Sequence, residues 1–300
     1  MENKYLVLDI GGTFIKYALM TNEGTFLEKN KVKTPVDSIE NLVKVIGKIY
    51  DYYKEQIEGI AISMPGIIDT ERGYAHTGGF LNYNSNKEIV KIIQKRCPIK
   101  ITIENDGKCA ALAEAWQGSL KGCRYGAVIV LGTGVGGGII IDGKVHKGRN
   151  FFAGEFSYMR NNTGIKNNFE NLWAISNGSA ALTKAFTEKK GLNPEEVDGF
   201  RVFESINSGD REASDILEGF ANNIAAQIIN IQCVLDPERV SIGGGISEQP
   251  ILIEYINKKL EEQYNSTEDF FYMPRIKVEK CTFGNDSNLL GALYNYISNE

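Results

Sequence analysis

The chain has few of the residues from which metal centres are commonly built. It contains two histidines, His76 and His146, and five scattered cysteines, no two of which have the spacing of a zinc ligand pair. A multi-histidine metal centre is therefore not expected. An odd number of unclustered cysteines favours a reducing compartment over a disulfide framework.

The sequence also lacks long apolar segments and a positive net charge, which narrows the class of protein. No apolar run is long enough to cross a bilayer, and the first residues lead directly into a predicted strand rather than forming a signal peptide. The net charge of -5 argues against a nucleic-acid surface. The sequence therefore predicts a cytoplasmic protein that uses neither a membrane nor a nucleic acid as partner.

Glycine, in contrast, is abundant and clustered. Three glycine clusters, at 11–12, 132–138 and 243–245, each follow a short apolar segment typical of a buried strand. Glycine in a structured interior costs conformational entropy, so folding alone is a weak explanation for three such clusters. Turns with bare backbone amides are suited to binding phosphate oxygens.

The first cluster lies beside charged residues. Asp9 interrupts the apolar segment 6–10, where a carboxylate is costly without a partner, and Thr13 and Lys16 follow the glycines. A carboxylate for a metal, bare amides and a cation together indicate a triphosphate site. A hairpin whose aspartate caps its own turn explains this segment equally well when it is taken alone.

The second cluster repeats the layout of the first. Its glycines also fit G-x-G-x-x-G, but a dinucleotide site requires a helix next, and a hairpin over 139–147 is predicted instead. Phosphate binding is the remaining use of its amides. Strand, glycine turn, strand, turn and strand occur in both places, which predicts two halves of similar topology.

The rest of the chain alternates predicted helices and strands. Asn105 and Asp106 open an alanine-rich helix over 107–116, where they are also ordinary capping residues. This alternation predicts an α/β protein with mixed sheets. Helical periodicity extends over 38–54, 87–96, 173–189, 214–235, 249–264 and 285–297, and short apolar strands lie at 59–63, 99–103, 240–242 and 275–281.

Taken together, the motifs resemble those of the ROK sugar kinases, within the actin-like ATPase (ribonuclease H-like) fold. The matching motifs occur in family order over nearly the whole chain: Asp9-Ile10-Gly11-Gly12-Thr13, Pro65-Gly66-Ile67-Ile68-Asp69, Glu104-Asn105-Asp106, Leu131-Gly132-Thr133-Gly134-Val135-Gly136, Gly154-Glu155, Gly243-Gly244-Gly245 and Gly284-Asn285-Asp286. The resemblance implies two lobes around a central cleft, with residues 1–108 in the first and 109–284 in the second. A final helix over 285–300 is expected to pack back on the first lobe.

The resemblance also implies an activity and a set of residue roles. The activity is transfer of the ATP γ-phosphate to a sugar hydroxyl with Mg²⁺, for which Asp106 is the expected general base. Asp9 is expected to hold Mg²⁺ through water, and Asn105 and Glu155 to hold sugar hydroxyls. Gly78 and Gly79 are expected to line the sugar pocket. The expected nucleotide contacts are Gly11, Gly12, Thr13, Lys16, Gly132, Thr133, Gly134 and Gly244.

The chain departs from the family pattern in one stretch. Family members follow Gly-Glu with a histidine and a cysteine-rich zinc loop that ends in a glutamate, but no cysteine occurs here between Cys123 and Cys233, so no zinc site is expected. Tyr158 takes the place of the histidine, unless it is a core aromatic residue, and Glu170 is a candidate for the distal glutamate. We therefore expect a hexose or glycoside substrate other than plain glucose.

Two other functions within the family are alternatives to a sugar kinase. A sugar-responsive repressor of the same family carries a DNA-binding domain before the first glycine motif, but only eight residues precede Asp9. A non-catalytic sugar-binding member of the family remains the alternative. The resemblance also implies a homodimer.

Overall fold

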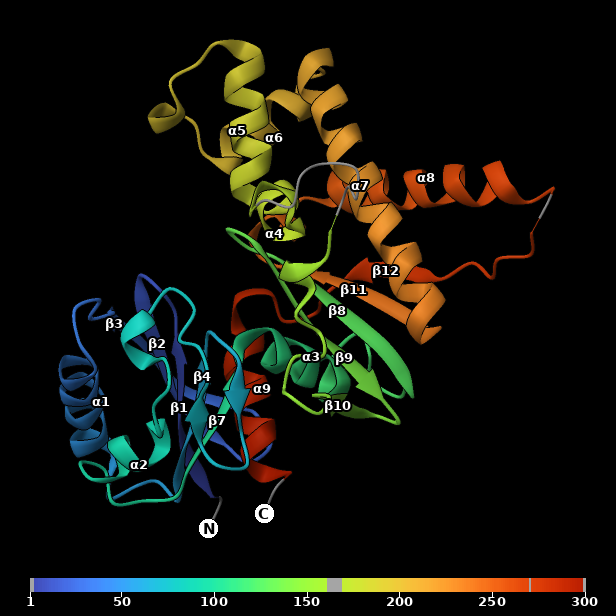
Figure 1. Ribbon diagram of the computed structural model, residues 1–300. Coiled ribbons are helices and arrows are strands. Elements are labelled where there is room, and N and C mark those ends of the chain that lie inside the picture. The colour runs from blue at the N-terminus through green and yellow to red at the C-terminus, as the bar shows by residue number, and fades with distance from the viewer. Residues whose placement is uncertain (1–2, 161–168, 270, 299–300) are drawn as a thin grey trace. The chain divides into compact units, whose positions relative to one another are not determined.

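The computed structural model describes residues 3–160, 169–269 and 271–298 (Figure 1). The chain forms two compact units, each with its own hydrophobic core. The first unit comprises Met1–Gly118, Lys144–Gly154 and Asp286–Glu300, and the second comprises Ser119–Gly143 and Glu155–Asn285. Within the described residues, no helix is both long and apolar enough to span a bilayer.

The first unit is built on a five-stranded sheet in the order β3-β2-β1-β4-β7. The first three strands are antiparallel, and the last two add in parallel. The strands are β1 (Lys4–Ile10), β2 (Phe14–Thr21), β3 (Phe26–Lys33), β4 (Gly59–Met64) and β7 (Ile101–Asn105). β4 is fully buried because helices cover the sheet, which explains why its sequence is apolar except for Ser63.

Four helices belong to this unit: α1 (Ile39–Tyr53), α2 (Ile89–Gln94), α3 (Asp106–Gln117) and α9 (Ser287–Ile297). Apolar residues of α1 and α2 share one core with the strands, and α9 lies against β1, β4 and α3 (Figure 1). A Cβ on Gly291 would lie 1.8 Å from the Cys109 carbonyl oxygen, so a side chain there would clash. The first segment of this unit continues to Gly118 and so includes all of α3, which is one continuous helix packed along α9.

Small elements complete the first unit. They are the two-stranded sheet of β5 (Ile68–Asp69) and β6 (Tyr74–Ala75), the short helix η1 (Asn82–Asn84) and β10 (Lys144–His146). The segment 147–153 follows β10 and is closed by a hydrogen bond from the Ala153 amide to the Lys147 carbonyl, 3.1 Å long. This segment contributes to the candidate site described below.

The second unit repeats the strand layout of the first. Its strands are β8 (Tyr125–Leu131), β9 (Val135–Ile141), β11 (Arg239–Gly243) and β12 (Lys277–Lys280), in the order β9-β8-β11-β12. β9 runs antiparallel to β8, whereas β11 and β12 add in parallel. The order matches β2-β1-β4-β7, so the predicted repeat of topology is confirmed.

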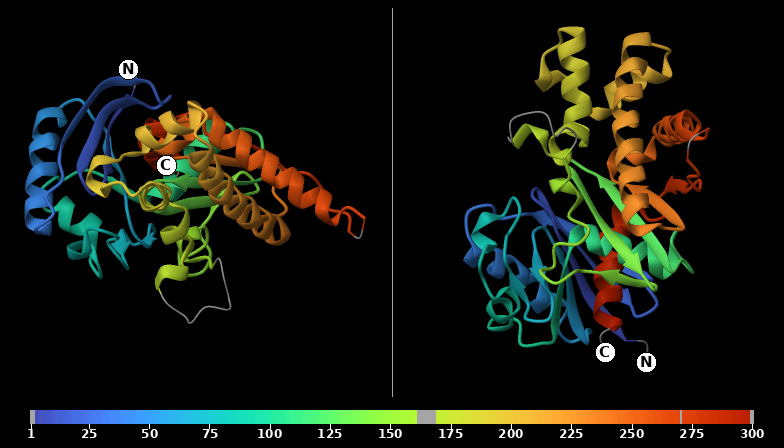
Figure 2. Two further views of the ribbon diagram at one scale, coloured as in Figure 1. Left: turned by 90° about the horizontal axis from the view of Figure 1, so that it is seen from above. Right: turned by 45° about the vertical axis from the view of Figure 1, so that its right-hand side comes forward.

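Helices of the second unit include the two longest in the described chain, α7 (Arg211–Leu235) and α8 (Pro250–Thr267), which pack against each other (Figure 2). The others are α4 (Trp173–Asn177), α5 (Ser179–Lys190) and α6 (Gly199–Asn207), with the short turns η2 (Phe156–Tyr158), η3 (Phe169–Asn171), η4 (Pro194–Glu196), η5 (Gly245–Glu248) and η6 (Gly284–Asp286). The predicted helix over 214–235 is confirmed and begins three residues earlier.

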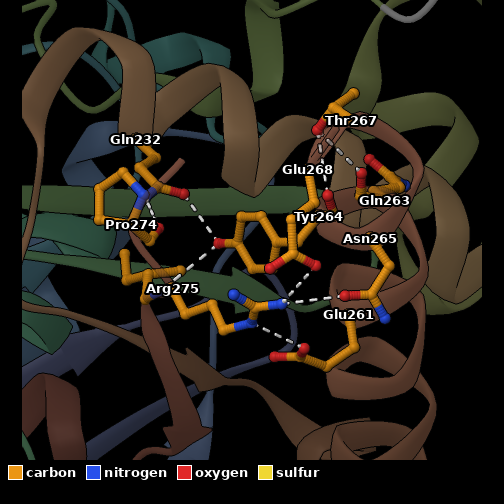
Figure 3. Close-up of polar contacts among 10 residues, drawn as sticks. Gln232, Glu261, Gln263, Tyr264, Asn265, Thr267, Glu268, Pro274 and Arg275 are labelled. Carbon is orange, nitrogen blue, oxygen red and sulfur yellow. Dashed lines mark hydrogen bonds and ion pairs between the residues drawn. The ribbon is translucent and has the colours of Figure 1, made fainter. Parts of the chain in front are cut away.

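A polar network joins α7, α8 and the segment before β12 (Figure 3). The Tyr264 hydroxyl donates to Gln232 Oε1 at 2.8 Å, and Arg275 Nε donates to Glu261 Oε2 at 3.0 Å. Burial raises the pKa of the Tyr264 hydroxyl, which therefore remains a donor over the physiological range. These contacts hold the C-terminal part of α8.

Two sequence expectations about local structure were wrong. The glycine run does not remain a turn after Gly134, because Gly136, Gly137 and Gly138 lie within β9. A Cβ on Gly137 would lie 2.3 Å from the Val128 carbonyl oxygen and 2.4 Å from the Phe156 ring. The predicted helix over 173–189 is two helices, because Gly178 is extended between them.

Candidate active site

The carboxylate of Asp9 is buried near the C-terminal end of β1, with 6% of the residue exposed. Its Oδ1 accepts hydrogen bonds from Ser63 Oγ and Asn288 Nδ2, both at 3.1 Å, and Lys16 Nζ lies 3.8 Å from Oδ2. Burial raises the pKa of Asp9, while Lys16 and the two hydrogen bonds oppose the shift. A buried carboxylate with an incompletely compensated desolvation cost is a suitable oxygen donor for a hard cation.

The turn after β1 is fixed by hydrogen bonds at its base and is exposed at its tip. The Gly11 amide donates to the Phe14 carbonyl at 3.1 Å, and Thr34 Oγ1 donates to the Gly11 carbonyl at 2.7 Å. Gly12 and Thr13 are exposed, and no atom lies within 4 Å of a Cβ placed on Gly12. The backbone at the tip is therefore exposed at Gly12 and Thr13, whereas the Gly11 amide, which was expected to be bare, is already used within the turn.

Asn105 and Asp106 have different roles at the start of α3. Asn105 is the N-cap, because its Oδ1 accepts from the Lys108 amide at 3.0 Å. Its Nδ2 donates to the Gly66 carbonyl at 2.9 Å and to Asp106 Oδ1 at 3.0 Å. Asp106 is thus not the capping residue: its partly exposed carboxylate lies in the first turn, where the helix dipole favours negative charge.

The predicted glycines of the sugar pocket lie near this pair. A Cβ on Gly66 would lie 2.0 Å from the Thr77 carbonyl oxygen, so the backbone before Gly78 packs directly on the segment that Asn105 binds. The Gly78 amide donates to Ser85 Oγ at 2.9 Å, and Gly79 has a φ of 57°. The structure therefore brings Gly78 and Gly79 close to Asn105 through Gly66.

Sequence reasoning missed an ion pair directly before Asn105. Glu104 is fully buried, its Oε2 lies 2.7 Å from Lys147 Nζ, and its Oε1 accepts from the Asn105 amide at 2.8 Å. Lys147 Nζ also donates to Thr70 Oγ1 at 2.7 Å. The only sequence signal was a charged residue directly after the predicted buried strand 99–103. Its partner lies 43 residues away, beyond the reach of any local pattern.

The second unit contains a pocket of about 690 Å³ next to its glycine turn. Leu131, Gly132, Thr133 and Gly245, which belong to the glycine motifs, line it. The rest of its lining was not singled out in the sequence: Ser179, Ala180, Thr183, Lys184, Thr187, Pro194, Asp198, Gly199, Phe200, Phe203, Ile246 and Gln249. Its size is typical of a small-molecule site. Gly178, a glycine within a segment predicted as one helix, is the signal from which the helix break before Ser179 could have been found.

Close backbone packing fixes the second turn. A Cβ on Gly178 would lie 2.1 Å from the Thr133 carbonyl oxygen, and one on Gly244, whose φ is 93°, would lie 2.3 Å from the Leu131 carbonyl oxygen. Gly134 lies against Ala174. Gly244 is therefore next to the turn, although the lining residue of its cluster is Gly245.

The remaining predicted residues lie elsewhere in the second unit. Glu155 is half-buried before η2, and Tyr158, whose residue is 50% exposed, closes that turn through a hydrogen bond from its amide to the Glu155 carbonyl. Tyr158 is thus not a core aromatic residue. Glu170 is exposed in η3, after the segment 161–168 that lies outside the described residues. In the described part of the chain, no three His, Cys, Asp or Glu side chains form a group able to hold a metal ion.

Comparisons with known proteins find relatives that match nearly the whole chain. The ROK family model matches residues 5–298. A beta-glucoside kinase of Listeria monocytogenes is 27% identical over 99% of this chain and 98% of its own, and an N-acetyl-D-glucosamine kinase of Mannheimia succiniciproducens is 28% identical over 95% and 96%. A crystal structure of a ROK family protein from Streptococcus pneumoniae in complex with sucrose has a TM-score of 0.88 and 29% identity, covering 99% of this chain and 98% of that chain.

Proposed function

Because the chain belongs to the ROK family, we propose that it is a sugar kinase that transfers the γ-phosphoryl group of ATP to a hydroxyl of a hexose or glycoside. The observation that carries this proposal is the arrangement at the start of α3. There, a partly exposed aspartate stands at a helix N-terminus beside an asparagine that is fixed by three hydrogen bonds.

Asp106 is the general base of the proposed reaction. Its carboxylate accepts the proton of the sugar hydroxyl as that oxygen forms a bond to the γ-phosphorus, and the bond from phosphorus to the β-phosphate oxygen breaks. The N-terminus of α3 favours the ionised carboxylate that this step requires. Asn105 holds Asp106 Oδ1 through its amide, so one carboxylate oxygen is oriented before the sugar binds.

Asp9 and the turn after it serve the phosphates. Asp9 would hold Mg²⁺ through water, and the metal ion would supply positive charge for the β- and γ-phosphate oxygens. Gly12 and Thr13 offer backbone amides, supported by the Thr34 contact to Gly11. Lys16 lies close to Asp9, so in the proposed site its positive charge favours the ionised form of that carboxylate. Lys16 would also face the phosphates.

The nucleotide would use the pocket of the second unit. Gly132, Thr133 and Gly134 supply the second phosphate turn, and Gly244 approaches the nucleotide next to Gly245 in the pocket wall. Phe200, which is 80% exposed at this pocket, offers an aromatic face to a purine base. ATP and Mg²⁺ are therefore the proposed cofactors, without zinc.

The residues proposed to contact the sugar in the first unit are Asn105, Gly78 and Gly79. In the second unit, sugar contacts of Glu155, Tyr158 and Glu170 stay a prediction of the family resemblance. Relatives whose names specify beta-glucosides and N-acetyl-D-glucosamine support a substituted hexose as the acceptor. The lack of a cysteine between Cys123 and Cys233 supports a sugar site shaped without the metal loop.

The test is a coupled assay of sugar-dependent ADP formation with Mg²⁺ and ATP. The sugars are glucose, N-acetyl-D-glucosamine, cellobiose and phenyl β-D-glucoside, and the phosphorylated product is identified by mass. We expect turnover with at least one substituted hexose. Sugar binding by calorimetry without any turnover would instead identify a non-catalytic family member, and a strong preference for free glucose would contradict the expected substrate.

A further inference from the structure

A second pocket, of about 600 Å³, lies entirely within the first unit. It is lined by Ile67, Asp69, His76, Arg149, Asn150, Phe151 and Phe152, and we name it the aromatic pocket. Its volume is within the range of small-molecule sites, roughly 300–1,000 Å³. None of the roles proposed above uses these seven residues.

One wall of the aromatic pocket is continuous with the candidate acceptor site. Ile67 follows Gly66, whose carbonyl accepts the hydrogen bond from Asn105. The Ile67 amide donates to Thr77 Oγ1 at 3.0 Å, and the His76 amide donates to the Ile67 carbonyl at 2.9 Å. This wall is therefore tied to Asn105, the residue next to the proposed base.

The other lining residues, 149–152, are linked to the same site by the buried ion pair. Residues 149–152 belong to the segment 147–153, whose first residue, Lys147, pairs with Glu104. Glu104 in turn accepts from the Asn105 amide. Both sets of lining residues are thus linked by hydrogen bonds and one ion pair to Asn105, the residue next to Asp106.

The lining has the chemistry of a carbohydrate site. The Phe151 and His76 rings are stacked, with centroids 6.3 Å apart and an interplanar angle of 28°, and Phe152 is 44% exposed. Such faces pack against the C–H face of a pyranose or against an aryl ring. Arg149 and Asn150 add hydrogen-bond donors for hydroxyl groups, while Asp69 in the lining disfavours an anionic occupant.

The backbone at Phe151 has a strained conformation. Phe151 has a φ of 58°, a conformation that a bulky side chain rarely adopts outside sites where the surroundings impose it. Strain of this kind is concentrated at binding and catalytic sites. We propose that the aromatic pocket is a subsite for the part of a glycoside that is not phosphorylated, either a second sugar ring or an aryl group.

This inference rests on the proposed sugar kinase function and names its substrate class. The test compares kcat/KM for cellobiose and phenyl β-D-glucoside with kcat/KM for glucose. In Phe152→Ala and in Arg149→Ala, the kcat/KM for a glycoside divided by the kcat/KM for glucose is expected to fall about tenfold. A fall of this size corresponds to the loss of one good aromatic or hydrogen-bonding contact. Phe271→Ala, which removes another exposed phenylalanine in the second unit, is the matched control and leaves the ratio unchanged.

Calorimetry separates failure of this inference from failure of the kinase proposal. If no sugar is phosphorylated, tighter binding of cellobiose than of glucose, with the difference lost in Phe152→Ala, still supports the subsite. A glycoside-to-glucose ratio that stays the same in both variants, in turnover or in binding, overturns it. Melting temperatures of both variants, expected near that of the wild type because both side chains are exposed, confirm that folding is intact.

Discussion

The two units place their candidate residues by opposite means, although their strands follow the same order. In the first unit, charged and polar side chains do so: Asp9 is held by Ser63 and Asn288, and Glu104 is held by Lys147. In the second unit, the turn is confined by backbone atoms packed against Gly178 and Gly244. Equal topology therefore does not imply equal chemistry, and each unit is sensitive to a different kind of substitution.

The largest effect on stability is expected where a buried charge loses its partner. In Lys147→Met, the Glu104 carboxylate stays buried without its cation, which should lower the free energy of unfolding by about 3–5 kcal/mol. Urea denaturation measures this change. The double variant Glu104→Gln/Lys147→Met should recover much of the loss, and a double variant as unstable as Lys147→Met would show that the ion pair is not the cause.

A smaller effect is expected from a methyl group in the packed turn of the second unit. Gly178→Ala places a Cβ against the Thr133 carbonyl and should cost about 1–3 kcal/mol, with weaker ADP binding because the turn must shift. Gly12→Ala is the matched substitution in the first unit, where the space is open, and should change stability by less than about 0.5 kcal/mol. Urea denaturation measures the stability of both variants, and titration with ADP measures their nucleotide affinity. Equal losses of stability in the two variants would show that the two turns do not differ in how tightly they are packed.

The smallest effect on stability is a pH dependence from Asp9. Because the pKa of Asp9 is raised in the folded protein, the folded state binds the proton more tightly than the unfolded state. Protonation of Asp9 therefore stabilises the folded protein fully at a pH below 3.8, the ordinary pKa of the side chain. This stabilisation is lost as the pH rises through the higher pKa that Asp9 has in the folded protein. Asp9→Asn should remove this decline. Denaturation curves at a series of pH values check it, and parallel wild-type and variant profiles would contradict it.

Much of this arrangement was predictable from local sequence, because strands, caps and glycine turns depend on neighbours in the chain. The apolar segment before Gly11, the helix within 38–54 and the long helix that ends at Leu235 were all indicated by pattern. The family resemblance was likewise carried by motifs and is confirmed by the match to residues 5–298.

What the sequence did not predict depends on contacts between distant segments. Gly178 is extended between α4 and α5, where the Thr133 backbone leaves no room for a side chain, and Asn288 binds Asp9 across 279 residues. Lys147 and Glu104 look like ordinary surface and strand residues when they are read alone. No periodicity marks such pairs, so the supports of the site emerge only from the folded chain.

The most direct test of the account is the turnover of Asp106→Asn with a saturating accepted sugar and MgATP. If Asp106 takes the proton of the acceptor hydroxyl, kcat should fall by about 10²–10⁴-fold while ADP affinity stays within about twofold of the wild-type value. Asp215→Asn, at an exposed position on α7, is the matched control and should behave as the wild type. A kcat for Asp106→Asn close to the wild-type value would contradict the assignment.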